Sequence, residues 1–324
     1  MRTLSPAARR RFPALAAALL AACGDPFGPH PTNDPVTLVA RMRVIDSIVG
    51  DRVLQANGTL GLAFRPPRDA AGLLPDTLLG RTFEWDLAAD RYTLSTRAGA
   101  PADGVRHVLY RVQSGSPAAP LAEVGRTDLR PLAAAAPTVR TVVTGTGEFS
   151  SSGADLRVST VVGTAAATVD AAGVVRSADR RADVRAGYAF APDAVTIDVA
   201  VDVPARELAV RAIVQTYVFA GGTRQDADLR LHSRGEVMTM QGWVQRLDLP
   251  GGASYTADLT LYLNGRVLAT IIGTDGTIGF RDADGVIVAG EFAQALNVFF
   301  RSPGTLQGSV AGLIQPSVNF LAGN

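Results

Sequence analysis

The chain has 324 residues, of which 47% are hydrophobic and 19% charged, a composition that excludes a disordered chain and suffices for one large or two medium globular domains. Its 31 basic residues, all arginine, are matched by 30 acidic residues, and the formal net charge is +1. This balance excludes the dense basic face that nucleic-acid binding requires.

The first 22 residues have the layout of a secretory signal peptide. Arg2 and Arg9–Arg11 form a positive region without acidic residues, and residues 13–22 are almost entirely Ala and Leu. Ten apolar residues would cover only about 15 Å as a helix, too short for a bilayer core of about 30 Å. We therefore expect residues 1–22 to be a signal peptide and not a membrane span. The run Arg9–Phe12 is also similar in part to a twin-arginine export signal, which leaves that export route as an alternative.

The single cysteine of the chain, Cys23, ends this apolar run in the sequence LAACG. Residues 20–23 resemble the lipobox of bacterial lipoproteins, and the resemblance covers only residues 1–24. It implies that a signal peptidase cuts between Ala22 and Cys23, that the thiol carries a diacylglyceryl group, and that the new amino group is acylated, for example with palmitate. The alternative is an ordinary signal peptide with a free thiol, which is a liability in an exported protein.

Residues 23–35 are expected to form the lipidated cysteine and a tether. The segment GDPFGPHPTNDP contains four prolines and has no periodicity, so it would reach roughly 35 Å in a semi-extended form. Two or more acyl chains anchor a protein stably where one does not. The expected location is the cell envelope, lipid-anchored and facing the periplasm. Gly24 directly after the cysteine favours the outer membrane over the inner membrane.

An N-terminal unit over 36–130 is expected to contain one helix and a β-hairpin. Asp34-Pro35 is a good helix start, and apolar residues recur at helical spacing from there, which predicts a helix over 35–50, extended at most to 56 because Asn57-Gly58 should stop it. Residues 82–86 and 91–95 alternate around the turn 87–90 and predict a hairpin, and residues 104–112 predict another strand. The stretch PLAAAAP at 131–137 would separate this unit from the rest, although both could form one continuous domain.

The segment 138–324 is expected to be a large antiparallel sheet with C-terminal helices. Strands follow each other every 10–13 residues as far as 288, and Val195–Val203 alternates strictly between apolar and polar or small residues. Asn264-Gly265 is the strongest of several hairpin signals. Helices are expected at 290–300 and within 303–324. The predicted fold class is mainly β: a curved, half-barrel-like meander of ten to thirteen strands with an N-terminal helix and one or two C-terminal helices.

Motifs for catalysis or cofactor binding are absent from the sequence. His30 lies in the tether, and His107 and His232 are expected to be solvent-facing residues of two strands, without the spacing of a zinc site. The serines at 150–152 lack the first glycine of a nucleophile elbow, and the missing lysine excludes Ser-Lys chemistry and Schiff bases. Gly145-Thr146-Gly147 lacks the third glycine of a dinucleotide loop. We therefore expect no catalytic residue and no cofactor.

One segment matches a calcium loop in part. Asp282, Asp284 and Glu291 would be ligands at positions 3, 5 and 12 of an EF-hand loop, with Gly285 as the turn glycine. Position 1 is Phe280 where Asp is required, and the preceding residues are typical of a strand. The competing interpretation is a hairpin turn in which an Asp side chain caps its own backbone.

Architecture and lipobox together suggest three functions. The first is a non-catalytic envelope lipoprotein with a structural or protein-binding role. The second is a carrier or receptor for an apolar ligand held between the sheet and its helices, because the layout is similar to that of half-barrel lipoproteins that handle lipids at the outer membrane. The third is a hydrolase with an unrecognised site. The expected partners are the membrane, through lipid on Cys23, and an envelope protein or apolar ligand, but not nucleic acid.

Overall fold

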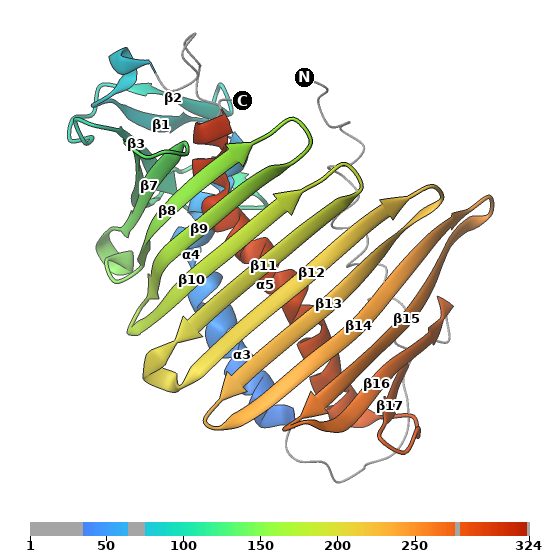
Figure 1. Ribbon diagram of the computed structural model, residues 1–324. Coiled ribbons are helices and arrows are strands. Elements are labelled where there is room, and N and C mark those ends of the chain that lie inside the picture. The colour runs from blue at the N-terminus through green and yellow to red at the C-terminus, as the bar shows by residue number, and fades with distance from the viewer. Residues whose placement is uncertain (1–34, 64–74, 276–278, 323–324) are drawn as a thin grey trace. The chain divides into compact units, whose positions relative to one another are not determined.

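The computed structural model describes residues 35–63, 75–275 and 279–322, and the fold of this part is mainly β (Figure 1). Fifteen strands belong to one large sheet, and β4 and β5 form a separate two-stranded sheet. The helices, including three single-turn 3-10 helices, are α3 (Pro35–Val49), α4 (Arg52–Ala63), η1 (Asp76–Leu78), η2 (Gly147–Phe149), η3 (Pro204–Arg206) and α5 (Gly290–Ala322). The strands are β1 (Thr82–Asp86), β2 (Arg91–Ser95), β3 (Val105–Tyr110), β4 (Val112–Gln113), β5 (Ser116–Pro117), β6 (Glu123–Leu132), β7 (Thr138–Gly145), β8 (Gly153–Val162), β9 (Ala167–Ser177), β10 (Arg180–Phe190), β11 (Ala194–Val203), β12 (Leu208–Phe219), β13 (Gly222–Ser233), β14 (Glu236–Leu249), β15 (Gly252–Leu263), β16 (Arg266–Thr274) and β17 (Gly279–Asp282).

The chain forms two compact units. The first unit comprises Arg43–Arg211 with Leu306–Asn324, and the second comprises Ala212–Thr305 with the chain up to Met42. In the first unit the strand order is β11-β10-β9-β8-β7-β6-β3-β1-β2, and in the second it is β17-β16-β15-β14-β13-β12. The strands pair antiparallel, except that β1 and β3 are parallel. The predicted mainly β fold with an antiparallel meander and flanking helices is confirmed, with more strands than the ten to thirteen expected.

The alternation seen in the sequence separates two faces of the sheet. In β11, Val199, Val201 and Val203 are buried, whereas Asp202 between them is exposed. The buried set faces the helices, because every second side chain of a strand points to the same side. In the first unit α4 packs against β3, β6, β7 and β8, with Val53 and Leu60 fully buried. The opposite face of this unit's sheet, called the outward face below, carries the charged side chains.

The turns follow the predicted chemistry. Asn264 and Gly265 both have positive φ, at 51° and 79°, as a two-residue hairpin of this type requires. The predicted hairpin over 82–95 pairs in register from Thr82 and Ser95 to Asp86 and Arg91. Asp86 caps its turn, because its Oδ1 accepts hydrogen bonds from the amides of Ala88 and Ala89.

The N-terminal helical region differs from the prediction at its end. Helix α3 ends at Val49, but a second helix, α4, begins at Arg52, where Asp51 caps it by accepting a bond from the amide of Val53 at 2.9 Å. Asn57-Gly58 lies inside α4, so the predicted stop was wrong. Asn57 is fully buried and bonds to Thr127 and to the carbonyl of Leu313, and these tertiary bonds outweigh its weak helix propensity.

One C-terminal helix, α5, spans both segments, 290–300 and 303–324, for which one or two helices were predicted. Helix α5 continues through Pro303 and Pro316, which each remove one backbone hydrogen bond. Beyond Pro316, Ser317 bonds to Thr141 and Asn319 donates to the carbonyl of Gly61, so contacts within the first unit hold the helix in place. In the stretch 131–137, expected to separate two units, Pro131 and Leu132 end β6 and pair with β7, and residues 133–137 form the turn between these two strands.

Candidate functional site

Four arginines form one row across the outward face of the first unit. Arg130, Arg140 and Arg157 lie directly opposite one another on β6, β7 and β8. On β9 the row continues with Ala172, which lies opposite both Arg157 and Arg185 of β10. The row thus places like charges side by side and is interrupted by one small side chain.

Acidic residues flank the arginine row on both sides. On one side of the row lie Asp155 of β8, two residues before Arg157, and Asp183 of β10, two residues before Arg185. On the other side, Asp170 of β9 and Asp198 of β11 lie opposite Gly187 of β10. This interleaving reduces the repulsion that neighbouring arginines would otherwise experience.

The charges near the row are not all paired. Arg140 forms a bidentate pair with Asp155 at 2.9 and 2.7 Å, and its hydrogen bonds lower the pKa of the Asp155 carboxyl. Arg211 forms a similar pair with Asp198 at 2.9 and 2.6 Å. For Arg157 and Arg185, by contrast, no carboxylate of the described residues lies within ion-pair distance. Nε of Arg130 lies 3.8 Å from Oδ1 of Asp103, so two of the four arginines of the row have a carboxylate neighbour and two, Arg157 and Arg185, are available.

A shallow depression of about 580 Å³ lies where the row is interrupted. Small residues form its floor, because Ala172, Gly187 and Ala200 leave room between the longer side chains. Its rim carries three arginines, two aspartates and a serine: Arg157, Arg185, Arg211, Asp170, Asp198 and Ser159. This arrangement suits the binding of a small polar group by fixed charges.

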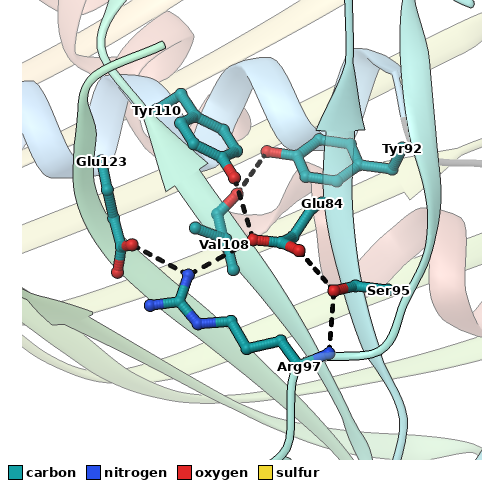
Figure 2. A network of polar contacts seen from close by, with 7 residues as sticks. All are labelled: Glu84, Tyr92, Ser95, Arg97, Val108, Tyr110 and Glu123. Atoms are coloured by element: carbon teal, nitrogen blue, oxygen red, sulfur yellow. Dashed lines mark hydrogen bonds and ion pairs between the residues drawn. The ribbon is translucent and has the colours of Figure 1, made fainter.

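A second cluster of polar side chains joins β1, β2, β3 and β6 in the same unit. Figure 2 shows Glu84 facing Ser95, Arg97 and Tyr110, and Arg97 reaching on to Glu123 at 2.9 Å. The hydrogen bond from Ser95 is the main reason that the pKa of Glu84 is lowered. Burial is the main reason that the pKa of Tyr110 is raised to about 12, with Glu84 adding to the effect. Glu84 therefore stays ionised and Tyr110 stays protonated at neutral pH, as in a structural network.

His107 lies beside this cluster and is fully buried, so the expectation that it faces solvent was wrong. Its ring stacks on Phe83 at 5.0 Å and meets the edge of Tyr92 at 5.4 Å. Burial lowers its pKa to about 3, so the imidazole is neutral at physiological pH. The pattern contained the signal, since His107 alternates in phase with the apolar residues Val105 and Leu109. His232, in contrast, is exposed as expected.

The calcium candidates are arranged as a turn. Oδ1 of Asp282 accepts hydrogen bonds from the amides of Asp284 and Val286, at 3.0 and 2.9 Å, which is the competing interpretation of this segment. Glu291 lies in the first turn of α5. Across the described residues no group of three or more His, Cys, Asp or Glu side chains is placed to hold a metal ion.

The remaining sequence-predicted residues are distributed differently. Ala22, Cys23 and His30 lie outside the described residues. Of the serines at 150–152, Ser152 donates a hydrogen bond at 3.0 Å to Asp51, the residue that caps the start of α4. Sequence reasoning missed the arginine row, because it appears only once the strand register is known. Comparisons with protein-family models, curated proteins and solved structures find no match.

Proposed function

We propose that the chain is a lipid-anchored lipoprotein of the bacterial cell envelope that faces the periplasm and has a binding or structural role, not a catalytic one. The observation that carries the anchoring is the lipobox-like sequence ending at Cys23, the only thiol of the chain. The thioether needs a sulfur at this position, and the small residues before it suit the cleavage. Gly24 favours the outer membrane as the destination.

None of the helices in the described part of the chain has both the length and the apolar character that crossing a bilayer requires. Two or three acyl chains on Cys23 would hold the protein stably, since each buried methylene contributes about 0.8 kcal/mol.

The binding role is supported by the outward face of the first unit. Arg157 and Arg185 there flank a depression and have no carboxylate of the described residues within ion-pair distance. The network around Glu84 and the buried His107, in contrast, stabilises the packing of β1–β3 and β6. The charges of that network are paired with one another, so Arg157 and Arg185 are better placed to meet an envelope component.

The alternative function, a carrier for an apolar ligand between sheet and helices, is less well supported. In the first unit this layer is occupied by buried side chains such as Leu60, Leu109 and Leu129. Asn57 at the same layer donates to the carbonyl of Leu313 and accepts from Thr127, both at 2.8 Å. Such directional bonds fix a helix against a sheet and favour packing over a ligand space. Solvent extraction of the purified protein followed by mass spectrometry would reveal a bound lipid if the carrier function were right.

The anchoring is tested by metabolic labelling with radioactive palmitate. We expect Cys23→Ser to abolish the label and to leave the precursor uncut. A matched control, Cys23→Ser combined with Ser150→Cys, restores one exposed thiol in the turn before β8 and should remain unlabelled. Label that persists in Cys23→Ser, or that returns in the control, would show that the lipid is not attached through the lipobox.

A further inference from the structure

We propose that the depression on the outward face of the first unit binds an anionic group, a carboxylate or a phosphate, between Arg157 and Arg185. The proposal rests on the binding role proposed above and names the class of ligand for that surface. Its evidence is separate, because it depends on the folded sheet and not on Cys23.

The strand register places Arg157 and Arg185 on the two sides of Ala172. Arg157 and Arg185 are each directly opposite Ala172, so their backbones are two strand spacings, or about 10 Å, apart. An arginine side chain is long enough to extend over Ala172 from either side. A planar guanidinium presents paired donors that match a carboxylate or phosphate, and two of them can hold one anion together.

The other arginines nearby show what distinguishes this pair. Arg140 belongs to the same row but is already held by both oxygens of Asp155. Arg211, on the rim of the depression, is held in the same way by Asp198. Arg157 and Arg185 are both exposed, and no carboxylate of the described residues is within 4.0 Å of either. A bound anion would supply the charge that their neighbours in the row obtain from aspartate.

The surroundings also restrict the ligand. Asp170 lines the depression on the side away from the arginine row and has no ion pair within the described residues. Its carboxylate would repel a second anionic group of a larger ligand and would accept a hydrogen bond from a hydroxyl or amino group. The favoured ligand is therefore a single anionic group attached to a hydrogen-bond donor, as in a sugar acid, a peptide terminus or a phosphorylated polyol.

The test uses the processed protein in detergent, with inorganic phosphate and acetate as two separate probes titrated by calorimetry at low salt. We expect Arg157→Ala and Arg185→Ala each to weaken the binding of at least one probe about tenfold. Arg140→Ala, in the same row, should change the affinity less than about twofold, because Asp155 already occupies that side chain. Ala172→Leu should also abolish binding, because it fills the floor and leaves both arginines in place. Circular dichroism shows whether each variant remains folded.

Location is tested by footprinting with phenylglyoxal, which modifies arginine selectively. The bound probe should slow the modification of Arg157 and Arg185, with Arg140 unchanged. The proposal is wrong if neither probe binds, if Arg157→Ala and Arg185→Ala bind like the parent protein, or if Arg140→Ala weakens binding equally. The preferred probe distinguishes phosphate from carboxylate. Binding retained in Cys23→Ser while palmitate labelling fails would separate this site from the anchor.

Discussion

The buried imidazole of His107 should make the first unit lose stability as the pH falls from 7 to 5. His107 has an exposed fraction of 0%, and burial lowers its pKa from 6.5 to about 3. The unfolded chain therefore binds a proton on this residue at pH values where the folded chain does not. The free energy of unfolding is therefore highest, as far as this residue is concerned, above about pH 6.5. It falls progressively as the pH decreases from about 6.5 toward 3.

The size of the effect follows from the two pKa values. One pKa unit corresponds to about 1.4 kcal/mol, so the free energy of unfolding should fall by about 2 kcal/mol between pH 7 and pH 5 through this residue alone. This window lies above the pKa values of Glu84 and Asp155, which are lowered by their hydrogen bonds and so titrate below it.

The assay compares the parent protein with His107→Phe, which keeps an aromatic ring beside Phe83 and Tyr92. Urea unfolding is followed by the fluorescence of Trp85 in a Trp243→Phe background, so that the signal reports the first unit. The stability difference between the two proteins should change by about 2 kcal/mol from pH 7 to pH 5. Equal pH dependence in both proteins would refute the assignment of a depressed pKa to His107.

Three further outcomes are expected. Asn57→Leu should lower the free energy of unfolding by about 2–4 kcal/mol, because it leaves the Leu313 carbonyl and the Thr127 hydroxyl without their buried partner. Chemical denaturation measures this loss, with Thr59→Ala on the same helix as the control. An equal loss in Thr59→Ala would contradict the prediction. Gly61→Ala should destabilise the protein, because the added Cβ would lie 2.6 Å from Cβ of Gln315. In Gly308→Ala the added Cβ meets no atom within 4 Å, so this change should stabilise the protein by about 0.5–1 kcal/mol. Melting temperatures of the two variants that shift in the same direction would disprove the close helix packing. Asp128→Ala should lower the free energy of unfolding several times more than Asp155→Ala, because the Arg106–Asp128 pair is largely buried. The exposed Arg140–Asp155 pair contributes at most about 1 kcal/mol. Comparable melting temperatures of the two variants would argue against this ranking.

The strands were largely predictable because their physics is local. The strand predicted over Val195–Val203 and the turn at Asn264-Gly265 depend on residues adjacent in the sequence, and both are present as expected. The fold class followed from many such segments in succession.

Features that depend on distant residues could not be predicted in this way. Asn57 remains helical because it bonds to residues 70 and 256 positions away in the chain. Helix α5 passes Pro316 with contacts from Thr141 and Gly61, which no local pattern contains.

The candidate site belongs to the same non-local class. Arg157, Ala172 and Arg185 become neighbours only through the register of three strands, and a shift by one residue in either hairpin would turn one of them to the other face. The charges themselves were visible in the sequence, but their order across the sheet was not.

The meander has a consequence for how the first unit assembles. From β6 to β11 each strand pairs with the next one in the chain, through turns of a few residues. Closing so short a loop costs little chain entropy, and each added strand provides a template edge for its successor. The interactions of each strand are confined mainly to its two neighbours. We therefore expect this stretch to fold by adding one strand at a time. A force applied at one strand should detach the hairpins one after another.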